Sequence, residues 1–224
     1  MIQLFELETQ NPKRRMSPFV WRIRLALLHK GLAFEGLPVT FLDKTGMEPS
    51  GSAKVPVIKD GDTWVSDSFD IACYLDKTYP DAPLMKDVAL ARFFNAWVNR
   101  TVISALFPML TLDICKALDA ENAAFFRATR EKVIGCTFEE ACEGRLDKRS
   151  SFQQTLSPMR DILKNQPFLD GESPAWSDYT AGGAFIWALL APAFDPLEGD
   201  DILIAWRNRI LDLYNQNARK AILG

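Results

Sequence analysis

An apolar helix with an end signal on each side, set between two strand patterns, most restricts the fold of this 224-residue chain. Ser17 and Pro18 are typical of a helix N-cap and first position, and Gly31 is typical of the left-handed residue that ends a helix. Apolar residues recur between them at helical spacing. Residues 2–7 and 34–41 on either side alternate as strands do. A strand–helix–strand order predicts that these two strands lie parallel in one sheet, joined by a right-handed crossover.

A hairpin and a second helix complete the first third of the chain. Residues 54–58 and 63–65 have strand character, and the Asp60-Gly61 pair between them is a strong turn signal. Asp67-Ser68 then opens a helix with apolar residues at helical spacing, which ends near residue 79.

The pattern beyond residue 88 is helical only. We therefore predict a small α/β domain over residues 1–82 and a larger all-helical domain over residues 88–224, with residues 81–87 as the linker. A long helix over residues 88–106 is expected to kink or end at Pro108. Later helices are expected over residues 121–134, 153–164, 179–190 and 202–214, with a capping box that opens another helix at Thr137.

Composition and charge exclude several classes of protein. A net charge of −3 and a pI near 5.3 give no footprint for nucleic acid. Four irregularly spaced cysteines and a single histidine predict neither a disulfide scaffold nor a metal site. The longest apolar run, residues 181–194, is short for a membrane span and is interrupted by Pro192. The N-terminus shows no secretory signal, so we expect a cytoplasmic protein with reduced thiols and no membrane partner.

Three motifs in order make the chain resemble the glutathione transferases. They are Ser17-Pro18-Phe19-Val20 at a helix start, Val55-Pro56-Val57-Ile58 before the hairpin, and Asp67-Ser68 at the head of the next helix. The resemblance implies a thioredoxin-like α/β N-terminal domain followed by an all-α C-terminal domain. Within the family, Ser-Pro-Phe-Val-Trp-Arg, His-Lys-Gly-Leu and Tyr-Leu-Asp-Lys-Thr-Tyr-Pro look most similar to bacterial glutathione-dependent β-aryl-etherases and fungal-type relatives.

Ser17 is the candidate catalytic residue. A free thiol titrates near pH 8.5, and only its thiolate is a competent nucleophile. A hydroxyl at the positive end of a helix can donate to sulfur and lower that pKa while its oxygen still caps the helix. The expected role is therefore to activate the thiol of glutathione and not to attack. The alternative is a plain N-cap.

The resemblance assigns the rest of the glutathione site. It implies a cis Val55–Pro56 bond that presents the backbone to the cysteinyl part of glutathione, the alternative being a trans proline at a strand edge. Asp67 and Ser68 suit the ammonium and carboxylate of the γ-glutamyl group, the alternative being a surface helix cap. Lys54, or less favourably Lys44, would hold the glycyl carboxylate, although lysines in such loops are usually solvated.

An apolar pocket between the domains would take the second substrate. Candidates for its lining are Phe19, Phe94 and Trp97, and we leave open which of the last two lines it. Phe93 and Phe107 lie on the same stretch, and most of these rings are expected to be core.

Three other features have charged or polar side chains that could serve a function. The Lys13-Arg14-Arg15 run in the loop before Ser17 is expected to be solvated, the alternative being attraction of an acidic substrate. His29 is expected at a helix C-terminus with no base role. Asp178 matches a buried capping residue of the family, but Ala175 lacks the partner side chain, so a weakened cap is expected.

The function expected from these residues is that of a glutathione transferase acting on a hydrophobic aromatic electrophile. Its sharpest version is glutathione-dependent cleavage of a β-aryl ether with a phenolate leaving group. The alternatives are a non-catalytic glutathione- or ligand-binding protein and, since position 17 is Ser and not Cys, less favourably a thiol–disulfide oxidoreductase. The resemblance also implies a homodimer.

Overall fold

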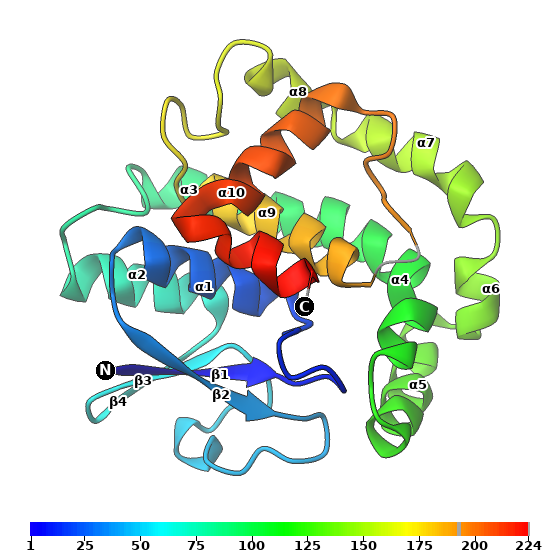
Figure 1. The fold of residues 1–224 in the computed structure, drawn as a ribbon, viewed down its shortest axis with the longest axis horizontal. Coiled ribbons are helices and arrows are strands. Elements are labelled where there is room, and N and C mark those ends of the chain that lie inside the picture. The colour runs from blue at the N-terminus through cyan, green and yellow to red at the C-terminus, as the bar shows by residue number, and fades with distance from the viewer. Residues whose placement is uncertain (192–193, 224) are drawn as a thin grey trace.

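A computed structural model describes residues 1–191 and 194–223 (Figure 1). Residue 224 and residues 192–193, with the Pro192 that interrupts the longest apolar run, lie outside the described residues. The chain begins as a mixed α/β unit and continues as helices only, which is the predicted fold class. The boundaries at 82 and 88 stay a prediction, and the elements change type between Thr78 and Val88.

A four-stranded sheet in the order β2-β1-β3-β4 organises the N-terminal part. The expected parallel pairing is present, with Ile2 opposite Phe34, and β3 and β4 form the expected hairpin. Gly61 in its turn has φ +57°, a conformation that favours glycine. The strands are β1 (Ile2–Leu7), β2 (Phe34–Val39), β3 (Val57–Asp60) and β4 (Thr63–Ser66).

Helices α1 (Pro18–His29) and α2 (Ser68–Thr78) cover one face of the sheet (Figure 1). Because side chains alternate along a strand, Leu4 faces these helices in the main core. Phe5 faces the other way, into a small cluster under the loop that carries the 3₁₀ helix η1 (Glu48–Ser50).

The rest of the chain forms helices that pack on α1 and on one another (Figure 1). The expected capping box is present: Thr137 Oγ1 accepts from the Glu140 N–H, and Glu140 Oε2 accepts from the Thr137 N–H. These elements are α3 (Val88–Trp97), the π-helix η2 (Val98–Ile103), α4 (Ser104–Lys116), α5 (Ala120–Ile134), α6 (Phe138–Cys142), α7 (Arg145–Thr155), α8 (Ser157–Leu163), α9 (Trp176–Leu190) and α10 (Asp201–Leu223).

Pro108 does not end the long helix, which runs from Val88 to Lys116. A π turn lies just before it, where the Ser104 N–H donates to the Asn99 carbonyl five residues back. Proline has no N–H for the carbonyl four residues earlier, and in this helix that carbonyl belongs to Ser104, the first residue after the π turn. The irregularity is therefore absorbed within a continuous helix.

One other helix prediction needs correction. The helix expected over residues 153–164 is two helices, α7 and α8, which meet at Leu156. The helix expected over residues 202–214 is confirmed, because the backbone leaves the helical conformation at residues 213–216, where Tyr214, Asn215 and Gln216 have positive φ. A further helical stretch, which was not expected, continues α10 to Leu223.

The segment Val88–Lys116 is long and apolar enough to cross a membrane by length and composition. One such helix is weak evidence for a span, because core helices meet the same criterion. Here its buried side supplies Val98, Val102 and Leu106 to the core that also contains α1 and α9.

Helix α9 is the centre of the molecule, and α1 packs along it. A Cβ at Gly183 would lie 2.5 Å from the Pro18 carbonyl oxygen, so only glycine allows this approach.

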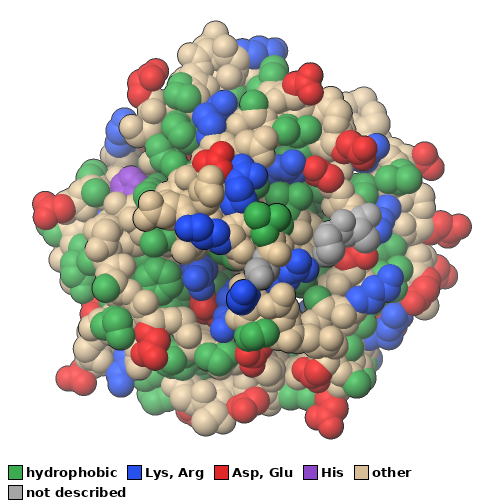
Figure 2. All heavy atoms as spheres, viewed as in Figure 1, with side chains coloured by type: hydrophobic (Ala, Val, Ile, Leu, Met, Phe, Trp, Pro, Cys, Tyr) green, Lys and Arg blue, Asp and Glu red, His purple; other side chains and the backbone are tan. Residues whose placement is uncertain are grey.

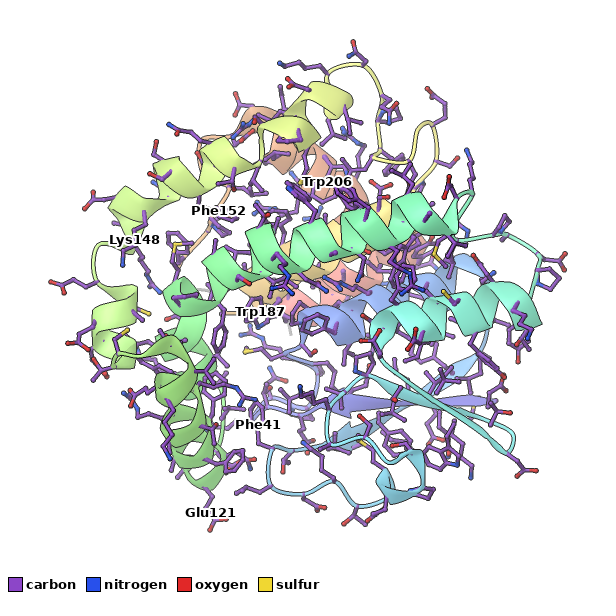
Figure 3. All side chains as sticks on the ribbon, turned by 180° about the vertical axis from the view of Figure 1, so that it is seen from behind. Phe41, Glu121, Lys148, Phe152, Trp187 and Trp206 are labelled. Carbon is purple, nitrogen blue, oxygen red and sulfur yellow. The ribbon has the colours of Figure 1, made fainter. Side chains whose placement is uncertain are left out.

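Phe41, labelled in Figure 3, lies in the loop after β2 and connects the N-terminal part of the chain to α5. Its N–H donates to Asn122 Oδ1 at 2.9 Å, and its ring lies 5.3 Å from that of Phe126.

Asp178 accepts more hydrogen bonds than the one from the N-cap residue that a capping box requires. Its carboxylate is fully buried and accepts hydrogen bonds from the N–H groups of Leu169, Asp170 and Ala175, and from Trp206 Nε1 at 2.8 Å. Burial raises the pKa of Asp178 to about 6, although these donors oppose the rise. As expected, Ala175 supplies no side chain to accept from the Asp178 N–H, so only the Asp178 half of the box is present. The donors of Leu169, Asp170 and Trp206 hold the Asp178 carboxylate in place but do not replace that acceptor.

Candidate functional site

One edge of the sheet gathers the three motifs. Val57 pairs with Ser66 of β4 and, on its other side, with the C-terminal half of β1. Continuing the β3–β4 register by one residue places Pro56 opposite Asp67, where α2 begins. Helix α1 runs back across the sheet from the end of β1 to the start of the parallel strand β2, so Ser17 lies at this edge too.

Ser17 is the N-cap of α1. Its φ of −142° is extended, its side chain is 6% exposed, and its Oγ accepts from the Val20 N–H at 3.3 Å. That bond uses an oxygen lone pair and leaves the hydroxyl proton for another acceptor. No acidic side chain in the first turn, residues 18–21, offsets the positive end of the helix dipole. The position therefore suits a partner that carries negative charge.

The Val55–Pro56 bond is cis, as the resemblance implies. Pro56 is buried, and Val55 packs against both the main core and the small cluster on the other face of the sheet. The bend before β3 is thus fixed from two sides, which sets the position of the backbone at the sheet edge.

Asp67 is the N-cap of α2. Its Oδ1 accepts from the N–H of Phe69 at 2.7 Å and of Asp70 at 3.4 Å, so neither bond uses Oδ2. Its φ of +72° is unusual for a residue with a Cβ, and such strain is often found at functional sites. The Asp67 side chain is exposed, whereas Ser68 in the first turn is 3% exposed. Both the helix-cap and the ligand-binding interpretations are compatible with this geometry.

A cavity of about 550 Å³ lies between the start of α2 and the α3–η2 helix. Two carboxylates, Asp67 and Asp70, stand on one wall, and two guanidinium groups, Arg92 and Arg100, belong to the other. A cavity with carboxylates on one wall and guanidinium groups on the other is complementary to a zwitterion, whose ammonium and carboxylate are attached to one carbon. The lining is formed by Asp67, Phe69, Asp70, Arg92, Asn95, Ala96, Asn99, Arg100 and Ser104.

Arg22 contacts two residues of this cavity's lining. It is fully buried on α1, and its guanidinium donates to Asn95 Oδ1 at 3.2 Å, Asn99 Oδ1 at 2.7 Å and the Thr180 carbonyl at 3.3 Å. Burial lowers the pKa of Arg22, and the Asp67 carboxylate opposes that shift. Arg22 thus links α1 and α9 to the α3–η2 helix, which forms the cavity wall opposite Asp67.

Sequence reasoning missed Arg22, Asn95 and Asn99. The available signal was a charged residue on the apolar face of α1, together with two asparagines four residues apart in an apolar helix. The π turn of η2 contains Asn99 and Arg100, and such turns often occur at functional sites.

The predicted cations have different positions. Lys54 is exposed in the bend before Pro56, close in sequence to the site. Lys44 lies instead over the Phe41 ring, 5.7 Å from its centroid, and donates to the Thr40 carbonyl. Burial lowers the pKa of Lys44.

The basic run before Ser17 is not simply solvated. Arg14 Nη2 donates to the Ile222 carbonyl at 3.0 Å, and Arg15 Nε donates to Glu6 Oε2 at 3.2 Å. Both arginines are half-buried because they tie the loop to the C-terminal helix and to β1. The preference for a solvated loop was therefore wrong for Arg14 and Arg15.

The predicted aromatic residues are partly brought together. The rings of Phe94 and Trp97 lie 5.4 Å apart on one side of α3, and both are half-buried. Phe19 is half-buried under the Arg22 guanidinium, 4.8 Å from its ring centroid. Phe107 stacks on Trp187, whereas Phe93 is 70% exposed. None of the five rings lines the 550 Å³ cavity.

His29 ends α1, about 18 Å from Ser17 at 1.5 Å per residue. Its Nδ1 lies 2.6 Å from the Tyr179 hydroxyl, which also pairs with the Tyr214 hydroxyl. Burial lowers the pKa of His29 and raises those of both tyrosines. The cluster is remote from the sheet edge.

Comparison with known proteins places this geometry in a family. The model of the glutathione S-transferase C-terminal domain matches residues 89–208, and that of the N-terminal domain matches residues 16–78. Glutathione S-transferase Z2 of Arabidopsis thaliana is 34% identical over 119 residues, 50% of this chain and 48% of that protein. Maleylacetoacetate isomerase of Rattus norvegicus is 25% identical over 62% of this chain and 70% of that protein. The chain spans about half the length of the first of these curated relatives.

Solved structures share the fold over nearly the whole chain. Glutathione S-transferase CsGST63524 of Ceriporiopsis subvermispora, in complex with glutathione, has a TM-score of 0.82 and 24% identity, and covers 96% of this chain and 97% of that one. Glutathione transferase GSTFuA2 of Phanerochaete chrysosporium has a TM-score of 0.77 and 25% identity, and covers 99% and 95%. The helical-domain model alone covers more than half of the 224 residues, so the protein belongs to the glutathione S-transferase family.

Proposed function

We propose that this protein activates the thiol of glutathione for attack on a hydrophobic aromatic electrophile. The observation that carries the proposal is the shared sheet edge, where Ser17, the cis Val55–Pro56 bond and the head of α2 converge. Ser17 would donate its free hydroxyl proton to the sulfur. The dipole of α1 would favour the thiolate, which lowers the thiol pKa toward neutrality.

The γ-glutamyl end of glutathione suits the charged cavity beside Asp67. Its ammonium would approach Oδ2 of Asp67, with Asp70 nearby, and its carboxylate would meet Ser68 and the N-terminal N–H groups of α2. Arg92 and Arg100 on the opposite wall add positive charge for the same carboxylate. Val55 and Pro56 would align the cysteinyl backbone, and Lys54 would meet the glycyl carboxylate.

The electrophile would lie against Phe19, Phe94 and Trp97. In the sharpest form of the proposal, the thiolate attacks the carbon that bears an aryl ether oxygen. A carbon–sulfur bond forms, the carbon–oxygen bond breaks, and the electron pair leaves on a phenolate. General conjugation follows the same substitution with another leaving group.

A second candidate function comes from the relatives. Several are named zeta-class glutathione S-transferases or maleylacetoacetate isomerases, which favours glutathione-dependent isomerisation, in which glutathione is released unchanged. A non-catalytic glutathione-binding protein is the remaining alternative.

The test is glutathione titration by calorimetry on wild type, Asp67→Asn and the matched control Asp62→Asn. Asparagine keeps the N-cap of α2 and tolerates positive φ, but it removes the charge that would meet the ammonium. We expect on the order of tenfold weaker binding in Asp67→Asn. Asp62 lies exposed between β3 and β4, so its variant should bind as wild type does. Equal affinity in all three proteins, or no binding at millimolar glutathione, would refute the assignment.

Turnover separates the candidate functions. Wild type is assayed with a chromogenic aryl halide, an aryl ether and maleylacetoacetate. Loss of free thiol in step with phenolate release supports ether cleavage, whereas conversion without loss of thiol supports isomerisation. Binding with no turnover of any of the three compounds supports the non-catalytic alternative.

The same proposal includes a cytoplasmic homodimer. Val88, Leu90 and Phe93 on α3 are 50%, 65% and 70% exposed, an apolar face that a second copy would cover. Light scattering should give twice the chain mass, and Phe93→Glu should shift the mass toward the monomer, whereas Val133→Glu on α5 should not. A monomeric wild type would contradict this part of the proposal.

A further inference from the structure

One wall of the charged cavity is a helix face with a regular polar pattern. Its two arginines are the only charged residues between Val88 and Leu112, so all the charges of this apolar segment line the cavity. This helix and α2, which forms the opposite wall, both face the viewer in Figure 3. The residues of the wall recur at the spacing of one helix face and are Arg92, Asn95, Ala96, Asn99 and Arg100.

Arg22 fixes the orientation of both asparagine amides. Its Nη1 donates to Asn95 Oδ1 at 3.2 Å, and its Nη2 donates to Asn99 Oδ1 at 2.7 Å. A guanidinium has donors only, so the amide atom that faces it must be the oxygen and not the nitrogen. The NH2 group of each asparagine therefore lies on the side away from Arg22.

The two amide NH2 groups are donors that the fold does not use. Within the part of the chain that the structure describes, neither Asn95 Nδ2 nor Asn99 Nδ2 has a hydrogen-bond acceptor. Neither atom belongs to the side-chain atoms that are both buried and unpartnered, so both NH2 groups reach solvent. Because both residues line the cavity, these accessible donors can meet a ligand in it.

The two arginines of this wall form no salt bridge with any acidic residue that the structure describes. Lys and Arg side chains also gather over the middle of the face in Figure 2, around the place where the chain ends in Figure 1. Of the residues near that end of the chain, Arg14 donates to the Ile222 carbonyl and Arg219 pairs with Asp212. These two cations are used within the fold, whereas those of the cavity wall keep their charge for a ligand.

The head of α2 is close to the asparagine wall. Burial lowers the pKa of Arg22, and the charge of the Asp67 carboxylate opposes that shift, so Asp67 and the group that holds both amides lie within Coulomb range. A carboxylate has two oxygens with about four acceptor positions. Donors at the head of α2 reach it from one wall only, and the remaining positions are open to donors from the other wall.

We propose that the side-chain amides of Asn95 and Asn99 donate hydrogen bonds to the α-carboxylate of the γ-glutamyl residue of glutathione. This inference rests on the proposed glutathione function and adds two binding residues to it. Ser68 and the N–H groups of α2 meet the carboxylate from one wall, and the amides meet it from the other. Arg22 sets the amide orientation before the ligand arrives, which lowers the entropy cost of binding. The amides therefore distinguish a carboxylate from a neutral group at this position.

The test is calorimetric titration of the full chain with glutathione and with its α-carboxamide, in which a neutral amide replaces the γ-glutamyl carboxylate. Asn99→Asp is the main variant, because aspartate keeps an acceptor for Arg22 but has an oxygen in place of the NH2 donor. We expect glutathione binding to weaken on the order of tenfold, and carboxamide binding to weaken by no more than about twofold. Asn95→Asp should show the same pattern.

Asn165→Asp is the matched control, since it makes the same change in charge at an exposed residue outside the cavity lining. Its affinity for both ligands should equal that of wild type. Equal weakening of both ligands in Asn99→Asp, or unchanged glutathione affinity in Asn95→Asp and Asn99→Asp, would overturn the inference and leave the proposed function standing. A wild type that does not bind glutathione would refute both.

Discussion

The N-termini of α1 and α9 belong to two buried helices that pack on each other, yet they are capped in opposite ways. At α1, a neutral hydroxyl accepts one bond, from Val20, and its proton is not used in that bond. At α9, the Asp178 carboxylate receives four donors, as many as its lone pairs accept. The difference shows how a structural cap and a functional one are told apart. All the acceptor positions of the structural cap, Asp178, are used within the fold, whereas the functional cap, Ser17, keeps a hydroxyl proton that can be donated to a ligand.

The largest effect is expected on breaking the α9 cap. Asp178→Ala leaves four donors without an acceptor, those of Leu169 and Trp206 fully buried, and should lower the free energy of unfolding by more than about 3 kcal/mol in urea titrations. Asp119→Ala, at the exposed N-cap of α5, is the control and should cost about 1 kcal/mol. Equal losses in the two variants would show that the Asp178 bonds contribute no more than an ordinary cap.

Breaking the α1 cap should instead affect catalysis. Ser17→Ala removes the proposed donor to sulfur and should lower kcat/KM on the order of a hundredfold, as loss of one preorganised donor does elsewhere. Its free energy of unfolding should fall by only about 1 kcal/mol. Thr137→Ala, at the N-cap of α6, loses a cap without touching the sheet edge and should keep full activity. Unchanged turnover in Ser17→Ala would move thiol activation to another group.

The same two helix ends show which features can be predicted from sequence: local ones can, and those that depend on tertiary packing cannot. The N-cap at Ser17, the parallel strands and the hairpin depend on neighbouring residues or on strand order, so they were predicted correctly. The strength of the Asp178 cap depends on Leu169 and Trp206, which only tertiary packing brings to it. Arg22 was missed for the same reason, since Asn95, Asn99 and Thr180 lie on other helices. Of the two outcomes expected at Pro108, an end of the helix is excluded, because the helix continues to Lys116.

A titration sharpens the comparison, because only the α9 cap carries a charge. Burial raises the pKa of Asp178 from 3.8 to about 6, so between these values the folded protein holds a proton that the unfolded chain has lost. The Asp178 contribution to stability is therefore largest below about pH 4 and falls as the pH rises to about 6, by at most about 1.4 kcal/mol per pH unit. The measurement is the difference in unfolding free energy between wild type and Asp178→Asn across pH 4–7. A difference that rises over this window would show that the pKa is lowered and not raised.

The smallest effect is expected from Ser17→Thr, and it decides whether the hydroxyl or the shape of position 17 matters. Threonine keeps an N-capping oxygen and a donor proton but adds a methyl group to a site that is 6% exposed. If the hydroxyl is what acts on sulfur, kcat/KM should stay within about threefold of wild type, a change of less than about 0.7 kcal/mol in transition-state stabilisation. The free energy of unfolding should also change by less than about 0.7 kcal/mol. A hundredfold loss in Ser17→Thr with stability intact would instead mean that the fit around position 17 controls catalysis.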